Sequence, residues 1–274
     1  MQGRRTPIAR RTEIQEDREK LAGTRPQGAH DEREAAARVQ EMFARITPRY
    51  DFLNHLLSLS LDRVWRRRTA NRFVTILRRP DARVLDLCCG TGDLTLALDR
   101  ARARVLCDAA ANRAPVAGSD FVLAMLDRAR AKTLLGKHRA MFAAADAMNL
   151  PYPDGTFDLV TSAFGFRNLA NYEKGMREFA RVLKPGGEVG ILEFSEPGSG
   201  PLAALFRFYF RQILPRVGGT ISGSREAYSY LPASVGRFPA PDELAALMER
   251  CGFREVEFEA WNFGSVLLHR ARRT

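Results

Sequence analysis

From residue 83 to the end of the chain, short apolar runs alternate with longer stretches in which apolar residues recur at helical spacing. Strands and helices that alternate in this way form βαβ units, in which a parallel sheet is covered by helices on both faces. We predict seven strands, at 83–87, 116–119, 141–144, 157–162, 188–194, 256–258 and 264–269. The predicted fold class is therefore α/β, with a mostly parallel seven-stranded sheet.

Helices are expected between and before these strands, where the apolar residues follow a helical period. The predicted helices cover 34–46, 61–77, 94–99, 124–134, 172–182 and 241–251. The segment 100–115 is rich in Ala and Arg and is longer than a usual connection from a helix to a strand, so we interpret it as an insertion. Residues 104–107 within it are an alternative to 116–119 as the second strand.

The 274 residues are enough to bury one sizeable core, and we expect one catalytic domain at 34–274 behind a flexible basic tail at 1–33. Nine Lys and Arg residues fall in the first 38 positions, among Pro and Gly and with few large apolar residues. Within the domain, we predict an N-terminal helical lid at 34–78 and an insertion at 200–235 that faces the substrate or a membrane.

The formal net charge of +11 favours anionic partners such as nucleic acid, acidic lipid or phosphorylated substrates, without choosing among them. The basic N-terminus is not followed by an apolar run, so export is not expected. No stretch approaches the roughly 20 continuous apolar residues of a spanning helix, so any membrane contact would be peripheral. We therefore place the protein in the cytoplasm, peripheral to the inner face of the cell membrane.

The four cysteines, Cys88, Cys89, Cys107 and Cys251, have no C-x-x-C spacing and no cluster of His residues nearby. Neither a zinc site nor a disulfide framework is predicted, and a reducing compartment fits best. The adjacent Cys88 and Cys89 are interpreted as small buried loop residues, because adjacent cysteines form a disulfide only with strain. The alternative is a reactive pair.

The loop after the first predicted strand is the main candidate for a ligand site. The strand ends near Asp86, and Gly90 and Gly92 let the backbone turn tightly and approach a ligand closely, because glycine has no Cβ. By itself this spacing is explained equally well by a structural turn. The third glycine of a dinucleotide fingerprint is missing, because Thr95 stands in its place.

Acidic residues near this loop indicate the charge of the ligand. Asp93 stands where a diphosphate would approach, and it suits a cationic sulfonium better. Asp120, at the end of the next strand, is placed to accept both hydroxyls of a ribose, with Asp108 as its rival if 104–107 is the strand. Asp146, after the third strand, is placed to accept from the exocyclic amine of an adenine, with Ala147 as apolar surface beside it. Helix capping for Asp120 and a simple turn for Asp146 are the alternatives.

The order of these elements resembles the class I methyltransferases, which are Rossmann-like, and finer matches resemble the quinone-pathway C-methyltransferases. That family comprises the demethylmenaquinone and 2-polyprenyl-6-methoxybenzoquinol methylases, and the similarity spans about residues 42–269. The most diagnostic stretches are Phe-Gly-Phe-Arg-Asn at 164–168, Arg-Val-Leu-Lys-Pro-Gly-Gly at 181–187, Glu-Phe-Ser at 193–195 and Tyr-Ser-Tyr-Leu at 228–231.

The resemblance implies S-adenosylmethionine as the cofactor, with Thr91, Asp120, Asp146 and Ala147 among its contacts. The family often has a serine where this chain has Ala163, and we assign that polar contact to Ser162, one position earlier. The cofactor site is thus expected at Asp86, Gly90, Thr91, Gly92, Asp120, Asp146, Ala147 and Ser162. Because a sulfonium is already activated, no metal is expected.

The implied reaction is the transfer of a methyl group to a ring carbon of a reduced polyprenyl quinone, demethylmenaquinol or a benzoquinol. Arg167 and Asn168 follow the fourth strand and are our candidates for orienting the quinol oxygens or stabilising a phenolate. Tyr230 is the third candidate catalytic residue. A surface ion pair is the alternative for Arg167.

Other residues have weaker claims. Tyr50, Asp51 and Asn54 are placed to fold over the cofactor as part of the lid. Tyr228 and His269 are candidates to lie around the substrate, although for His269 a packed residue is the favoured interpretation. The segment 201–221 mixes apolar residues with Arg207, Arg211 and Arg216, as a lipid-facing or tail-binding helix would, and ordinary packing or a homodimer contact explains it as well.

The expected partners are a lipophilic polyprenyl quinol and an anionic membrane surface. An RNA methyltransferase or another small-molecule methyltransferase is the competing function, since the +11 charge suits RNA. The chain lacks a recognisable RNA-binding motif and the Asn-Pro-Pro-Tyr type of tetrad, so no nucleic acid is expected. A cofactor-binding regulator without activity is the third alternative.

Overall fold

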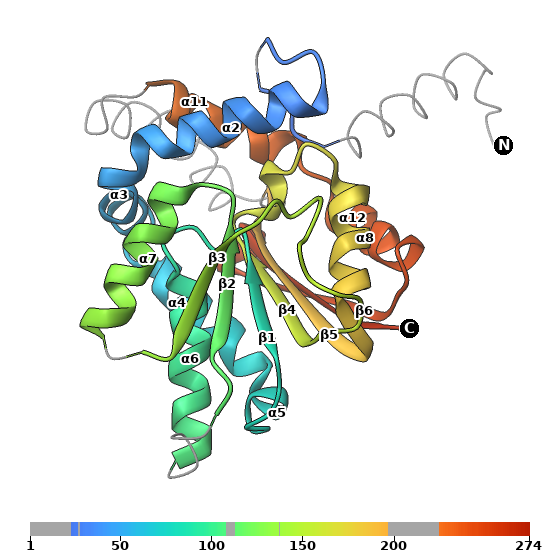
Figure 1. Cartoon of the computed structure of the whole chain (residues 1–274). Helices are drawn as coiled ribbons and strands as arrows, with labels where there is room; N and C mark the ends of the chain where they lie inside the picture. Colours follow the sequence, from blue (N-terminus) through green and yellow to red (C-terminus); the bar gives the residue numbers. More distant parts are fainter. Residues whose placement is uncertain (1–22, 27, 108–112, 137, 197–224) are drawn as a thin grey trace, which may run out of the picture.

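The computed structural model describes residues 23–26, 28–107, 113–136, 138–196 and 225–274. Its centre is a seven-stranded sheet (Figure 1). In spatial order the strands are β3 (Ala140–Ala144), β2 (Val116–Asp120), β1 (Val84–Leu87), β4 (Phe157–Ala163), β5 (Leu183–Phe194), β7 (Val266–Arg273) and β6 (Phe253–Trp261). Only β7 runs antiparallel to its neighbours, so the predicted mostly parallel sheet is confirmed.

Helices cover both faces of the sheet, because the central parallel strands are apolar on both sides. One face carries α4 (Leu61–Arg72), α5 (Val74–Leu77), α6 (Asp93–Leu106) and α7 (Leu123–Leu135), and the other carries α8 (Tyr172–Val182) and α12 (Pro241–Arg250). Phe73 and Leu98 lie in the core of the first face, and Phe179 and Met248 lie in the core of the second. β4 is buried over six consecutive residues between these two cores.

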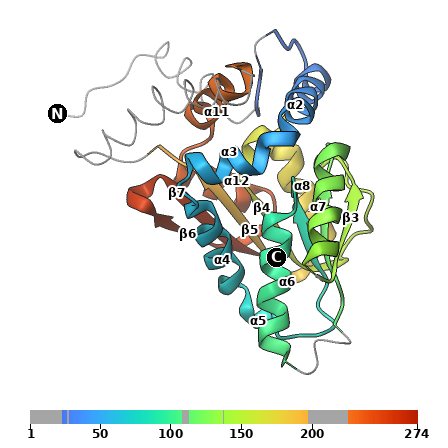
Figure 2. The ribbon, with the colours of Figure 1, turned by 90° about the vertical axis from the view of Figure 1, so that its left-hand side faces the viewer.

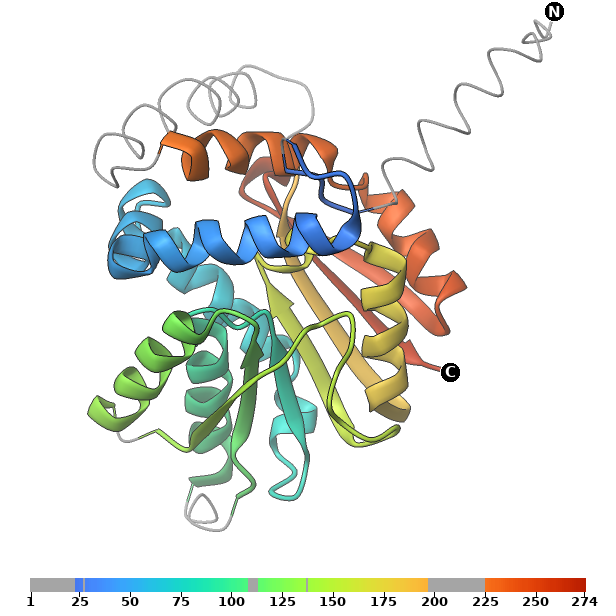
Figure 3. The same ribbon diagram turned by 45° about the horizontal axis from the view of Figure 1, so that its top comes forward.

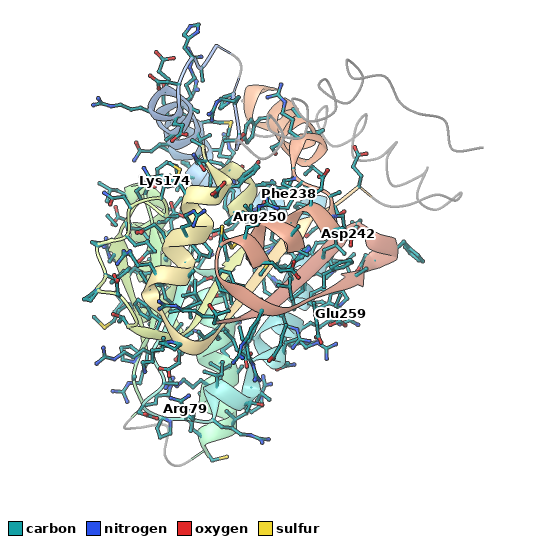
Figure 4. All side chains as sticks on the ribbon, turned by 90° about the vertical axis from the view of Figure 1, so that its right-hand side faces the viewer. Arg79, Lys174, Phe238, Asp242, Arg250 and Glu259 are labelled. Carbon is teal, nitrogen blue, oxygen red and sulfur yellow. The ribbon has the colours of Figure 1, made fainter. Side chains whose placement is uncertain are left out.

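Three further helices cover the end of the sheet where the parallel strands finish. They are α2 (Glu32–Ile46), α3 (Tyr50–Leu57) and α11 (Arg225–Arg237). Figure 3 shows α2 and α11 running side by side across this end, with α3 at the outer end of α2. Phe238, labelled in Figure 4, follows α11 and packs edge-on against Phe166 and Tyr172, which holds α11 to the sheet.

Several predicted boundaries differ from the structure. The predicted helix at 61–77 is divided near Phe73, whose φ of −106° leaves the helical region. α6 continues to Leu106, so the alternative strand at 104–107 is wrong and the second strand is β2. β5 begins at Leu183, five residues earlier than predicted, and its register against β4 shifts between Phe157 and Leu159.

The chain is ordered before residue 34, so the boundary predicted for the flexible tail lies too late. Thr24 is 2% exposed, and its backbone N–H donates to the carbonyl of Leu169. Asp31 caps α2 by accepting from the N–H of Glu34. Residues 1–22, and residues 200–224 of the predicted insertion, lie outside the described residues. Among the helices that are described, none is long and apolar enough to cross a membrane.

Candidate functional site

A cavity that is partly open to solvent lies between the sheet and its helical cover. Its walls come from the segments that follow the parallel strands, at 88–91 after β1, 120–122 after β2, 145–148 after β3 and 163–165 after β4. The cover contributes Val39, Phe43 and Tyr50. In open α/β sheets this edge, where β1 lies between β2 and β4, is where ligands bind.

The glycine loop turns as predicted, but its two glycines serve different purposes. Both lie in the left-handed region, with φ of +53° at Gly90 and +83° at Gly92. Gly90 lines the cavity. A Cβ on Gly92 would come within 3.0 Å of Phe142 and Ala129, so that glycine permits packing under the loop rather than contact with a ligand.

Asp120 at the end of β2 holds the glycine loop. One carboxylate oxygen accepts from the N–H of Gly90 at 2.8 Å, and the other accepts from the N–H of Val122 at 2.9 Å. Burial raises the pKa of Asp120, against these hydrogen bonds. Each oxygen keeps a second lone pair, and the residue lines the cavity, so the geometry is compatible with the predicted ribose contact. Asp108, its rival, lies outside the described residues.

Asp86 lines the base of the cavity and is fully buried. Its two oxygens accept from the hydroxyls of Thr95 at 2.7 Å and Thr161 at 2.9 Å. Burial raises the pKa of Asp86 to about 7, against these two hydrogen bonds. Asp86 therefore joins β1, β4 and α6 beneath the cavity.

The residues predicted for the adenine end of the site lie in the cavity wall after β3. Asp146 is exposed and lines the cavity, and its Oδ1 accepts from the N–H of Met148 at 2.9 Å. Ala147 and Met148 are 6% and 7% exposed and form apolar wall. This combination of a carboxylate and small apolar surface suits the edge and face of a purine.

The role predicted for Asp93 is not supported, because the protein supplies its cations. Lys132 donates to Asp93 at 2.8 Å, and Arg66 lies 3.8 Å from the other oxygen. Burial alone would raise the pKa of Asp93, but Arg66 and Lys132 lower it below its ordinary value. The charge of Asp93 therefore gives no evidence for a positively charged ligand. Its carboxylate is already paired.

The same lysine connects the cover to the glycine loop. Lys132 donates to Asp51 of α3 at 2.8 Å and to the hydroxyl of Thr91 at 2.9 Å. That hydroxyl in turn donates to Asp51. Asp51 was predicted as part of the lid, and in the structure its carboxylate is joined directly to the glycine loop.

Ligand atoms of His55, Asp62 and Asp93 lie within 4.8 Å of one another, which is a spacing that metal sites share. Arg66 donates to Asp62 and lies beside Asp93, so a cation already occupies this cluster. The cluster is an ion-pair network of the protein.

Tyr50 begins α3 and lines the cavity, with its ring 3.9 Å from the Cβ position of Gly90. Burial raises the pKa of Tyr50, and Arg66 and the side chain of Asn54 oppose this effect. The phenol is therefore a neutral donor, and it covers the glycine loop as the lid prediction required.

Arg167, our first catalytic candidate, does not line the cavity. It is 5% exposed and donates to Glu193 at 2.9 Å and to the carbonyl of Phe164. Its guanidinium also lies over the ring of Phe194. The alternative of a surface ion pair is also wrong, since the pair is buried. Arg167 is bound to the protein behind the cavity wall.

Asn168 and Tyr230 form a hydrogen-bonded pair, and Asn168 lines the cavity. The hydroxyl of Tyr230 lies 3.1 Å from Asn168 Oδ1 and 2.9 Å from the hydroxyl of Thr24. Burial raises the pKa of Tyr230, although the contact with Thr24 opposes it. Residues 24, 168 and 230 are remote in the chain, and the fold brings them together beside the cavity.

The surroundings of Ser162, Cys88 and Cys89 indicate structural roles. Ser162 is fully buried, faces the Cys88 thiol and does not line the cavity, so its predicted cofactor contact is wrong. Burial raises the pKa of both Cys88 and Cys89, which line the cavity as thiols. This favours loop residues over a reactive pair.

His269 is a packed residue, which is the interpretation that the sequence favoured. It is 2% exposed, stacks on Phe258 and hydrogen-bonds to the carbonyl of Pro241 at 3.1 Å. The side chain of Tyr228 lies outside the described residues.

The residues that sequence reasoning missed are Thr24, Arg66, Lys132 and Glu193. Glu193 begins the Glu-Phe-Ser stretch at 193–195 that resembles the family, so the sequence held a signal for this residue. Lys132 and Thr24 belong to no motif, and only their contacts show their importance.

A model of the ubiE/COQ5 methyltransferase family matches residues 30–273. The chain is 47% identical to demethylmenaquinone methyltransferase of Deinococcus radiodurans over 234 residues, covering 85% of this chain and 92% of that protein. It is 46% identical to demethylmenaquinone methyltransferase of Thermus thermophilus, covering 83% of this chain and 98% of that protein. It is 40% identical to the ubiquinone/menaquinone biosynthesis C-methyltransferase UbiE of Geobacter sulfurreducens, covering 86% and 88%.

Solved structures of similar fold include the [4+2]-cyclase SpnF, at 18% identity with a TM-score of 0.62 over 92% of this chain and 98% of that one. They also include a SAM-dependent methyltransferase of Thermotoga maritima described as a possible histamine N-methyltransferase, at 18% identity with a TM-score of 0.54 over 85% and 99%. These likenesses confirm the Rossmann-like fold alone.

Proposed function

The chain belongs to the ubiE/COQ5 methyltransferase family, and from this we propose that it transfers a methyl group from S-adenosylmethionine to a ring carbon of a reduced polyprenyl quinone, with demethylmenaquinol as the substrate. The observation that carries the proposal is one cavity whose walls include the glycine loop, Asp120 and Asn168, the partner of Tyr230. The glycine loop and Asp120 suit a nucleoside, whereas Asn168 and Tyr230 suit a hydroxylated ring.

The cofactor's groups fit the residues around the cavity. We assign the ribose hydroxyls to Asp120, the adenine amine to Asp146, and the adenine face to Ala147 and Met148. The buried wall excludes water around the apolar ring, and the left-handed turn at Gly90 leaves room for close approach. When bound, S-adenosylmethionine supplies an electrophilic methyl group on a sulfonium.

The side chains at the other end of the cavity hold the acceptor. Asn168 offers an amide, and Tyr230 a neutral phenol, to the oxygens of a quinol ring. A quinol hydroxyl that donates a hydrogen bond to the amide oxygen or the phenol oxygen makes the ring richer in electrons, which favours attack by the ring carbon. As the ring carbon bonds to the methyl group, the bond from the methyl group to sulfur breaks and the ring carbon loses its hydrogen as a proton. The pair orients the ring so that this carbon faces the methyl group. Arg167 and Glu193 fix the backbone from which Asn168 projects.

A paired assay tests the proposal. The purified chain is given S-adenosylmethionine with a labelled methyl group and, separately, reduced demethylmenaquinone, a reduced polyprenyl benzoquinone and bulk RNA. We expect label in the naphthoquinol product. Label in RNA and in neither quinol would contradict the proposal and favour the RNA methyltransferase that the +11 charge allows.

Tyr230→Phe is the informative variant for the acceptor site. Removal of the hydroxyl takes a partner from Asn168 and Thr24 and leaves the ring in place. We expect kcat/KM for the quinol to fall about tenfold or more, as for loss of a hydrogen bond worth roughly 1.4 kcal/mol. The Kd of S-adenosylhomocysteine, measured by calorimetry, is the internal control and should stay within about twofold. An equal loss of kcat/KM for the quinol and of affinity for S-adenosylhomocysteine would show that Tyr230 serves folding and not the acceptor site.

A further inference from the structure

The turn between α3 and α4 exposes four large apolar side chains within ten residues. Phe52 is 60% exposed, Leu56 41%, Leu59 79% and Leu61 37%. Phe52 and Leu56 are one helical turn apart on α3, so they share a face. We call these four residues the α3–α4 tip.

The backbone holds this tip outward. Leu59 and Ser60 have φ of +51° and +60°, a left-handed conformation that costs energy for residues other than glycine. This pair of residues turns the chain from α3 into α4 and leaves Leu59 in solvent. A leucine that is both strained and exposed contributes nothing to the core, which indicates a use outside it.

The charge that surrounds the tip is basic. Arg45 and Arg49 precede it, and Arg63 and Arg67 follow it, and all four are exposed. The two acidic residues between positions 47 and 72 are Asp51 and Asp62, and each is already paired with a cation of the protein. The outward face of this region is therefore apolar at its centre and positive at its rim.

The tip is continuous with the candidate site. α3 begins with Tyr50, which lines the cavity, and Phe43 of α2 lines it as well. Figures 1 and 2 show α3 beside α2, at the end of the molecule where the parallel strands finish. A surface that receives Phe52 and Leu59 therefore lies next to the cavity.

We propose that the α3–α4 tip inserts into the surface of a bilayer that contains anionic lipid, with Arg63 and Arg67 on the headgroups. Aliphatic side chains inside a ring of arginines match acyl chains below phosphates. A second copy of the chain would bring the same positive rim against itself, and RNA offers nothing for leucines to bury against. The inference rests on the proposed function in one respect, since a polyprenyl quinol resides in the bilayer.

Vesicle flotation of the full chain tests the proposal. The lipids are phosphatidylcholine alone and phosphatidylcholine with about one third phosphatidylglycerol. We expect partition onto the anionic vesicles to exceed that onto neutral ones at least tenfold and to fall in high salt, because salt screens the arginines. Failure of the wild-type chain to bind anionic vesicles would overturn the proposal.

Matched variants locate the surface. Phe52→Ser/Leu56→Ser/Leu59→Ser should lower partition at least tenfold, and Arg63→Gln/Arg67→Gln should remove the preference for anionic lipid. Leu134→Ser/Leu135→Ser, at side chains 80% and 88% exposed on α7, is the apolar control. Arg250→Gln/Arg254→Gln is the charge control, and Figure 4 shows Arg250 on the side of the molecule opposite to α3. Equal losses in tip and control variants would contradict the proposal.

Activity on two forms of the quinol separates this inference from the proposed function. A short-chain, water-dispersed quinol should be methylated equally by the wild type and the triple tip variant, whereas a vesicle-embedded quinol should be methylated only by the wild type. Methylation without vesicle binding would overturn the docking alone. Vesicle binding without methylation of any quinol would overturn the function alone. A dimer, detected by light scattering, that is lost in the tip variant and does not bind vesicles would assign the tip to a second copy.

Discussion

Asp120 and Asp86 end neighbouring strands, yet their carboxylates do different work. Asp86 accepts from two side-chain hydroxyls and is fully buried, so it joins strands and helix. Asp120 accepts from two backbone N–H groups and lines the cavity, so it shapes the glycine loop and still presents oxygen to a ligand.

Asp120→Asn should weaken cofactor binding about 10- to 100-fold, because both oxygens accept from N–H donors and an amide replaces one acceptor with a donor. Calorimetry with S-adenosylhomocysteine measures the Kd. Asp127→Asn, at a side chain 72% exposed on α7, is the control and should bind as the wild type does. An unchanged Kd for Asp120→Asn would show that another residue holds the ribose.

Charged residues near the site could not be assigned from their order in the chain. Arg167 follows a strand end and has the position of a substrate ligand, but Glu193 pairs with it. Asp93 opens a helix and has the position of a cofactor ligand, but Lys132 pairs with it. A buried charge takes the nearest opposite charge, and which charge is nearest depends on packing.

At the scale of elements, Lys132 joins three parts of the molecule. From α7 it reaches α3 through Asp51, the glycine loop through Thr91, and the start of α6 through Asp93. The N-terminal cover is thereby tied to the loop that it covers. We therefore expect ligand binding at the glycine loop to stabilise α3, and a well-ordered α3 to favour ligand binding.

Lys132→Met should leave Asp51 and Asp93 without their shared cation. We predict about five- to tenfold weaker binding of S-adenosylhomocysteine, and faster amide hydrogen exchange across 47–57, because a partly buried pair of this kind contributes roughly 1 kcal/mol. Lys132→Arg should keep most of the affinity for S-adenosylhomocysteine and most of the protection from hydrogen exchange. Arg130→Met, on the exposed side of the same helix and paired with Asp127, is the control. Faster exchange throughout the sheet would indicate general destabilisation instead.

For the whole molecule, the stability at acidic pH depends on His269. Burial lowers the pKa of His269 from 6.5 to about 4, although the carbonyl of Pro241 opposes this. The unfolded chain then binds a proton that the folded chain does not, so stability falls as pH falls from about 7 to about 4. The two pKa values differ by the equivalent of roughly 3 kcal/mol.

Urea unfolding between pH 7.5 and 4 checks this contribution. His269→Leu should be less stable than the wild type at pH 7.5, because it loses the bond to Pro241. The variant should lose less stability on acidification. The difference in free energy of unfolding between the two proteins should therefore shrink by roughly 3 kcal/mol between pH 7.5 and 4. His30→Gln, at an exposed residue, is the control. A gap that stays constant with pH would contradict the role of His269.

The alternation of apolar runs and helical stretches was sufficient to predict the sheet, its seven strands and the edge at which the cavity lies. The reason is local: strand and helix periods are written in neighbouring residues, and parallel strands place their ends at one edge. Each of the residues placed at this edge lies at the end of a strand or in the segment that follows it: Gly90, Asp120, Asp146 and Ala147.

Only the tertiary structure decided which of the remaining side chains face the cavity. Ser162 alternates with Ala163 along β4, and the strand's pleat places Ser162 in the core and Ala163 at the cavity. Thr24 reaches Tyr230 across 206 residues, and no local pattern records such a contact. Sequence by itself determined the scaffold and the loop at which we propose the cofactor site. Pairing between remote side chains follows from packing, so only the tertiary structure decided which charges are paired and which residues surround the proposed acceptor site.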